Sequence, residues 1–111
     1  MKTRPPLEKH EDAFIRKMYR AAGCVVISFS HPGKTMQTPG IPDLKVYEPY
    51  SGTTWWHEIK RQQGDGFLRV SSKQSVDQQW FQSLAEDYGE EYIIGARDVA
   101  ERKLRELGRI L

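Results

Sequence analysis

A chain of 111 residues, of which 38% are hydrophobic and 29% charged, has room for one small domain with a single core. The formal net charge of +2 excludes a protein that binds phosphates by overall charge alone, and the single cysteine, Cys24, excludes an internal disulfide. We find no signal peptide and no membrane-spanning apolar stretch in the sequence, so we expect an intracellular, cytoplasmic protein with no membrane partner.

The first predicted elements are a lead-in over residues 1–6 and a helix over residues 7–22. Apolar residues recur in this helix at 3.6-residue spacing and form one stripe: Phe14, Ile15, Met18, Tyr19 and Ala22. Glu11 continues the stripe one turn nearer the N-terminus, which would bury its side chain. An acid in a first turn also complements the helix dipole, and for Glu11 taken alone this second interpretation is favoured.

Three strands follow, and we expect them to form an antiparallel meander. They are predicted over residues 24–30, 43–47 and 53–60, which are rich in β-forming side chains. A loop over residues 35–42 contains two prolines and a glycine. Its last residue, Pro42, holds Ile41 extended, so the chain approaches Asp43 along a restricted path.

Side-chain alternation gathers charged residues on one face of this meander. Glu58 and Lys60 point one way in the third strand, and Ile59 points the other. His57 shares the side of Ile59, so we expect it to serve packing rather than bind a ligand. If the second and third strands pair, Asp43 comes level with Glu58 and Lys60. Such a cluster is costly unless something binds there, and a divalent cation on the carboxylates with a phosphate on the lysine would suit it.

The rest of the chain predicts a helix, a strand and a last helix. Ser71 and Gln74 have the spacing of a capping box, and the helix that follows runs to about Tyr88. Its apolar side is predicted to be Val76, Trp80 and Leu84, with Phe81, Ala85 and Tyr88 beside them. A strand over residues 91–95 should lie parallel to a neighbour, before a helix over residues 97–107. The predicted class is α/β, a single domain over residues 1–111 with a mixed central sheet of about four strands flanked by helices.

The order of these motifs resembles the VRR-NUC (virus-type replication-repair nuclease) branch of the PD-(D/E)xK nucleases. The resemblance covers roughly residues 8–95, and residues 97–111 lie outside its motif set. The matching positions are Glu11, Gly23, Gly40, Pro42, Asp43, Glu58, Lys60, Ser72, Lys73, Gln74 and Gly89. It implies a structure-specific endonuclease that hydrolyses phosphodiester bonds of DNA with Mg²⁺ or Mn²⁺.

The resemblance also implies roles for single residues. Asp43 and Glu58 would hold the metal with the Ile59 carbonyl, and Glu11 would reach it directly or through water. The metal would acidify a bound water and shield the charge of the scissile phosphate. Two further catalytic roles are implied for Lys60 and Gln74. Lys60 would orient the water or stabilise charge in the transition state, and Gln74 would position either of them.

The expected partner is DNA. Stand-alone domains of this size, bacterial or phage-encoded, are implied to act as homodimers on branched DNA such as Holliday junctions. Residues 1–34 hold seven Lys or Arg against three acids, and residues 77–98 hold one against six. DNA should therefore avoid the second helix, although for the charges taken alone ordinary solvated surface is the favoured interpretation. The expected DNA contacts are Lys34, Arg61, Arg69 and Lys73. The alternatives are a nuclease for flaps or other DNA, a catalytically inactive nucleic-acid-binding module, and a small interaction domain.

Overall fold

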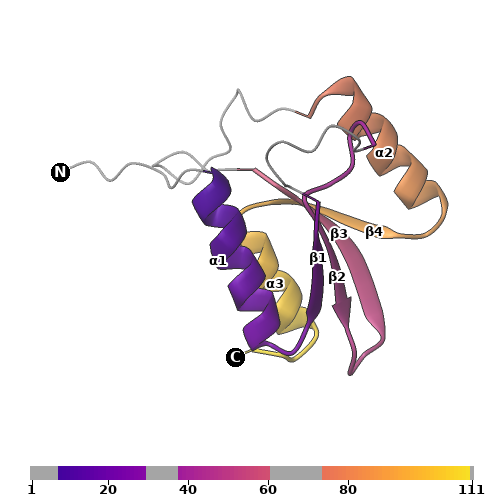
Figure 1. The fold of residues 1–111 in the computed structure, drawn as a ribbon. Coiled ribbons are helices and arrows are strands. Elements are labelled where there is room, and N and C mark those ends of the chain that lie inside the picture. The colour runs from indigo at the N-terminus through magenta and orange to yellow at the C-terminus, as the bar shows by residue number, and fades with distance from the viewer. Residues whose placement is uncertain (1–7, 30–37, 61–73, 111) are drawn as a thin grey trace.

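The computed structural model describes residues 8–29, 38–60 and 74–110 (Figure 1). Their helices and strands follow the predicted order: α1 (Glu8–Ala21), β1 (Val25–Ser28), β2 (Leu44–Glu48), β3 (Thr53–Ile59), α2 (Val76–Asp87), β4 (Glu91–Gly95) and α3 (Arg97–Glu106). None of the helices in these ranges is long and apolar enough to cross a membrane.

The four strands form one mixed sheet in the order β1-β2-β3-β4. β1, β2 and β3 are antiparallel neighbours, and β4 lies parallel to β3 after the crossover through α2. Helices α1 and α3 lie side by side along the sheet, while α2 sits apart from them (Figure 1). The structure therefore confirms the predicted α/β class, the meander and the parallel fourth strand.

The core lies between the sheet and the pair α1 and α3. It is a cluster of buried side chains that draws on all three: Ile15, Tyr19, Ala22, Cys24, Val26, Leu44, Val46, Trp55, Ile59, Ala100 and Leu104. The predicted stripe of α1 is confirmed except at Phe14, which is 44% exposed. Phe14 lies about 100° around the helix from Ile15, and the guanidinium of Arg97 stacks on its ring at 3.8 Å.

A chain of buried polar groups crosses this core. The Tyr19 hydroxyl lies 2.8 Å from His57 Nδ1, and His57 Nε2 lies 2.9 Å from the Gly95 carbonyl oxygen. Trp55 Nε1 donates to the Tyr19 hydroxyl at 3.3 Å. One arrangement satisfies every group, with Tyr19 donating to Nδ1 and Nε2–H donating to Gly95. Burial lowers the pKa of His57 to about 4, so the ring is neutral, as the predicted packing role requires.

The start of α2 corrects one prediction. Ser71 lies outside the described residues, and the capping box consists of Ser75 and Gln78 instead. The Gln78 backbone N–H donates to the Ser75 hydroxyl at 3.2 Å, and the Ser75 N–H donates to the Gln78 side chain at 2.8 Å. Both serine–glutamine pairs have the same spacing, so the pattern alone could not choose between them. Gln74 consequently precedes the helix by two residues.

The predicted apolar side of α2 is confirmed at Phe81 and Ala85 and is wrong at Val76, Trp80, Leu84 and Tyr88. Val76 is 81% exposed, Trp80 57% and Leu84 39%, so this stripe faces outward. The helix contacts the sheet through the neighbouring stripe, where Ala85 is buried and the ring of Phe81 lies 5.0 Å edge-on from Trp56. Trp56 alternates with the core residue Trp55, so α2 covers the face of the sheet opposite α1 and α3.

Candidate active site

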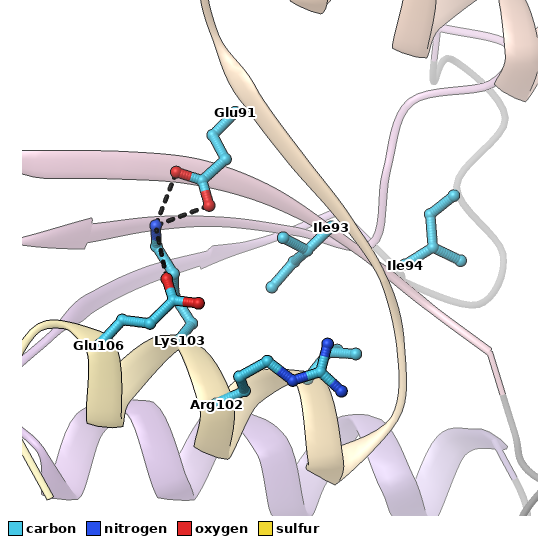
Figure 2. Close-up of a pocket in the computed structure, with 7 residues that line it drawn as sticks. Glu91, Ile93, Ile94, Arg102, Lys103 and Glu106 are labelled. Carbon is cyan, nitrogen blue, oxygen red and sulfur yellow. Dashed lines mark hydrogen bonds and ion pairs between the residues drawn. The ribbon is translucent and has the colours of Figure 1, made fainter.

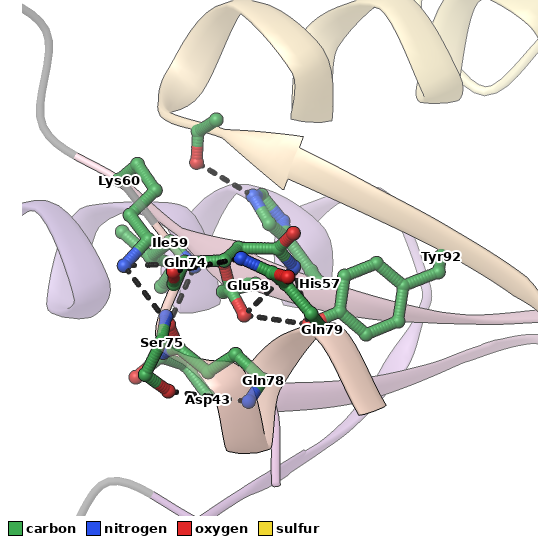
Figure 3. Close-up of polar contacts among 11 residues, drawn as sticks. Asp43, His57, Glu58, Ile59, Lys60, Gln74, Ser75, Gln78, Gln79 and Tyr92 are labelled. Atoms are coloured by element: carbon green, nitrogen blue, oxygen red, sulfur yellow. Dashed lines mark hydrogen bonds and ion pairs between the residues drawn. The ribbon is translucent and has the colours of Figure 1, made fainter. Parts of the chain in front are cut away.

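The β2–β3 hairpin brings Asp43 to Glu58. Leu44 pairs with His57 in this hairpin, so the residue before Leu44 stands opposite the residue after His57. Asp43 Oδ2 accepts a hydrogen bond from the Ile59 backbone N–H at 2.7 Å (Figure 3). The acid of the Pro-Asp loop is therefore fixed to the end of β3, on the α2 side of the sheet.

Glu58 is almost fully buried, at 1% exposure, and its two oxygens have different surroundings. Oε1 accepts from the Tyr92 hydroxyl at 2.5 Å and has a longer contact, 3.5 Å, with Gln74 Nε2. Oε2 has no hydrogen-bond partner among the described residues, and the Lys60 ammonium lies 3.9 Å from it. A buried carboxylate oxygen without a hydrogen bond is unusual and indicates a position for a ligand.

Lys60 lies between Glu58 and the start of α2. Its Nζ is 3.5 Å from Gln78 Oε1, and its backbone N–H donates to the Gly95 carbonyl at 3.2 Å (Figure 3). Gln74, which we expected to position Lys60 or a water, instead contacts Glu58 and Tyr92. The glutamine that contacts Lys60 is the capping residue Gln78.

Gly40 ties the Pro-Asp loop to α2. Its φ is +80°, and a Cβ added there would lie 2.2 Å from the backbone oxygen of Asp77 in the first turn of α2. No side chain fits so close to a peptide group, so glycine allows the loop and the helix start to meet. This contact holds Asp43 and the capping residue Gln78 in one local unit.

The structure places Glu11 apart from the Asp43–Glu58 pair. Glu11 is 4% exposed on α1, and Arg97 Nε donates to its Oε1 at 2.7 Å. Its Oε2 is buried without a hydrogen-bond partner among the described residues. Its partner Arg97 comes two residues after Gly95, and Gly95 pairs with Ile59 at the end of β3. Glu11 therefore lies near the end of the sheet that also carries Asp43 and Glu58. Across residues 8–29, 38–60 and 74–110, however, no three His, Cys, Asp or Glu side chains form a group that could hold a metal.

Comparisons with known proteins identify the fold. A solved structure described as "VRR_NUC domain" matches this chain with a TM-score of 0.62 and 23% sequence identity, over 89% of this chain and 94% of that one. The chain has the fold of a VRR_NUC domain. No protein-family model matches the sequence, and no curated protein matches it. The fold assigned from the motifs is confirmed, and at this identity the match concerns the fold alone.

Some of the residues predicted to contact DNA or to belong to the motif cannot be placed in this fold. Lys34, Arg61, Arg69 and Lys73, the expected DNA contacts, lie outside the described residues, as does Ser72 of the matched motif. The predicted site residues that the structure describes lie on α1, just before β2, at the end of β3 and just before α2.

Tyr92, like Gln78, is a site residue that the motifs did not indicate. It lies on β4, pairs with Trp56 and is 8% exposed. Burial and the neighbouring Glu58 carboxylate raise the pKa of the Tyr92 phenol well above its usual value, so the hydroxyl stays protonated and donates. The only available signal was the predicted parallel fourth strand, which did not specify the register that sets Tyr92 against Glu58.

A pocket of about 220 Å³ lies elsewhere in this fold, between β4 and α3 (Figure 2). Lys103 at its wall is paired with Glu91 at 2.6 Å and with Glu106 at 3.8 Å. This pocket is smaller than the roughly 300–1,000 Å³ of ordinary ligand sites. Because its lysine is already neutralised, it is a weaker candidate for chemistry than the Asp43–Glu58–Lys60 group.

The donor set at Asp43 and Glu58 suits a small hard cation. Mg²⁺ is commonly bound through one or two carboxylates, with waters and substrate phosphate oxygens completing its shell. The buried Glu58 Oε2, without a hydrogen bond from the described residues, is a position that such a cation would satisfy. The residues present therefore fit a Mg²⁺ or Mn²⁺ site.

Proposed function

We propose that this chain is a nuclease, specifically a Mg²⁺- or Mn²⁺-dependent endodeoxyribonuclease. The observation that carries the proposal is the convergence of Asp43, Glu58 and Lys60 at the end of β3. Two carboxylates with a nearby ammonium suit the hydrolysis of a phosphodiester, which needs neutralised charge and an oriented water.

Asp43 and Glu58 would hold the metal, with the Ile59 carbonyl as a third ligand. Glu11 remains a proposed further ligand, through water, from its position near the same end of the sheet. When bound, the cation would neutralise charge on the phosphate and make a water more acidic. Gln74 would hold Glu58 in position, because Gln74 Nε2 lies 3.5 Å from Glu58 Oε1.

Lys60 would take part directly in the hydrolysis of the phosphodiester. Its side chain is 12% exposed, and its ammonium would orient the attacking water and stabilise the charge that develops on the phosphate oxygens. The water oxygen bonds to phosphorus and the bond to the 3′ oxygen breaks. One proton of the water ends on the 3′ oxygen, so the products carry a 5′-phosphate and a 3′-hydroxyl.

We propose branched DNA, such as a Holliday junction, as the substrate of a homodimer. A junction has two equivalent scissile strands, which a two-fold symmetric pair of sites would match. Lys34, Arg61, Arg69 and Lys73 would contact the phosphates, and the whole chain of residues 1–111 would act as one domain. The proposed setting is the cytoplasm of a bacterium or of a phage-infected host.

The test is cleavage of a labelled four-way junction beside matched duplex, flap and single-stranded DNA, each with Mg²⁺, Mn²⁺ or EDTA. We expect symmetric cutting of the junction with metal and none with EDTA. Cutting of the other DNA forms instead would support the nuclease activity but would rule out the junction as its substrate. If a folded protein cuts nothing with either metal, the chain is a binding module rather than an enzyme.

A further inference from the structure

The hydroxyl of Tyr92 makes a short contact with the candidate metal ligand Glu58. Its distance to Glu58 Oε1, 2.5 Å, is at the short end of hydrogen bonds between a hydroxyl and a carboxylate. Both residues are buried, at 8% and 1% exposure, so little water competes for this bond. A hydrogen bond of this kind fixes the rotation of the carboxylate.

The side-chain amide of Gln74 determines which group donates in the hydrogen bond between Tyr92 and Glu58. Gln74 Nε2 lies 3.4 Å from the Tyr92 oxygen and 3.5 Å from Glu58 Oε1 (Figure 3). An amide nitrogen can only donate, so the Tyr92 oxygen accepts from Gln74 and its own proton is left for Glu58. Glu58 Oε1 therefore faces two donors, whereas Oε2 faces the Lys60 ammonium at 3.9 Å and has no hydrogen bond from the described residues.

We propose that Tyr92 is a positioning residue that makes Glu58 a one-oxygen metal ligand, with Oε2 as the ligating atom. This inference rests on the proposed metal site. Because Oε1 faces both the Tyr92 hydroxyl and the Gln74 amide, Oε2 is the oxygen left open to a cation. Such binding suits Mg²⁺ and Mn²⁺, which favour compact octahedral shells, more than Ca²⁺, which readily takes both oxygens of a carboxylate.

The test compares Mn²⁺ and Ca²⁺ binding to the full chain by calorimetry, in the wild type and in Tyr92→Phe. Removing a hydrogen-bond partner of a metal ligand typically weakens metal binding by about 10- to 100-fold. We expect the Mn²⁺ dissociation constant to rise at least about 10-fold and the Ca²⁺ constant to change much less, because a freed Glu58 can offer both oxygens. The matched control is Tyr88→Phe, which removes a hydroxyl from a tyrosine that is 80% exposed and should change neither constant.

The outcomes separate this inference from the proposed function. If Glu58→Gln binds Mn²⁺ as the wild type does, the metal site itself is wrong. If Glu58→Gln loses Mn²⁺ while Tyr92→Phe keeps wild-type constants, only the role of Tyr92 is wrong. An equal loss of both ions in Tyr92→Phe would overturn the one-oxygen role, since a general structural defect does not distinguish between cations.

A second measurement needs no tyrosine variant. The infrared carboxylate bands of the wild type, recorded with and without Mn²⁺, separate one-oxygen from two-oxygen binding, and subtraction of the Glu58→Gln spectra assigns the change to Glu58. We expect the one-oxygen signature. A two-oxygen signature at Glu58 would overturn the inference even if Tyr92→Phe does not fold.

Discussion

The strand β3 sends buried polar side chains to both faces of the sheet, and these side chains differ in how completely they are hydrogen-bonded. On the α1 and α3 side, Tyr19 and His57 are both 0% exposed, and each is hydrogen-bonded to its neighbours. On the α2 side, Glu58 is 1% exposed and carries an oxygen without a hydrogen bond from the described residues. A satisfied polar network stabilises one packing, whereas an unsatisfied one keeps a position open for a ligand.

Adjacent residues of β3 produce this contrast. His57 and Glu58 follow one another in the chain, and the alternation of a strand sends them to opposite faces. The Gly95 carbonyl joins the two sides, because it accepts from His57 Nε2 at 2.9 Å and from the Lys60 backbone N–H at 3.2 Å. The hydrogen-bonded His57 thus supports the backbone that carries Glu58 and Lys60.

The largest effect should come from removing the charged groups of the α2 side. Lys60→Ala should lower cleavage at least about 100-fold, because it removes the group that stabilises transition-state charge, while the fold and metal binding stay largely intact. Asp43→Asn should lose cleavage and metal binding together. Cleavage rates and Mn²⁺ calorimetry on the two variants check this, and wild-type cleavage by Lys60→Ala would disprove its role.

The next effect concerns the contact between the Pro-Asp loop and α2. Gly40→Ala places a Cβ 2.2 Å from a backbone oxygen at a φ of +80°, so we expect a loss of roughly 3–4 kcal/mol in the free energy of unfolding. Gly89→Ala is the control, because Gly89 has a similar φ of +76° but open space around it. It should cost only about 1 kcal/mol. Urea unfolding measures both, and equal losses would show that the close approach of loop and helix is unimportant.

The buried His57 should make stability depend on pH. The pKa of His57 falls to about 4 in the fold from 6.5, so the unfolded chain binds more protons between these values. Stability is therefore lost as the pH falls through this window, by about 3 kcal/mol for this group alone. Asp98 and Asp12 act in the opposite direction, since their charges favour the protonated ring.

His57→Gln removes this titration, so the free energy of unfolding should fall less steeply between about pH 6.5 and pH 4 than in the wild type. Urea unfolding at several pH values measures this slope. His10→Gln is the control, because His10 is exposed on α1 and its replacement should leave the slope unchanged. An identical slope in the wild type and in His57→Gln would mean that the buried histidine does not titrate as its surroundings indicate.

The smallest effect should come from the outward side of α2. Val76 is 81% exposed, so Val76→Ala should change the free energy of unfolding by no more than about 0.5 kcal/mol. Phe81→Ala removes the ring that packs on Trp56 and should cost clearly more. Thermal unfolding of both variants checks which stripe of the helix contacts the sheet.

The features of the fold that depend on local periodicity could be predicted from the sequence. Alternation in β3 correctly separated His57 from Glu58, and the hairpin brought Asp43 level with Glu58 as expected. The 3.6-residue spacing identified α2 but not its inner side, because Val76-Trp80-Leu84 and Phe81-Ala85 are neighbouring stripes of comparable apolar character. The choice between them depends on tertiary packing against Trp56.

Tyr92 and Gln78 escaped prediction for a related reason. Tyr92 reaches Glu58 only through the register of two parallel strands that are separated by a helix and a long stretch of chain. Gln78 reaches Lys60 only because the helix cap is at Ser75, and the sequence offered two caps of the same spacing. Contacts between distant segments decided both positions.

The most direct test of this account is a crystal of the protein soaked in MnCl₂ and measured at a wavelength where manganese scatters anomalously. The account predicts an anomalous peak within bonding distance of Glu58 Oε2 and the Asp43 carboxylate, on the α2 side of the sheet. Manganese bound only elsewhere, with this position empty, would contradict it.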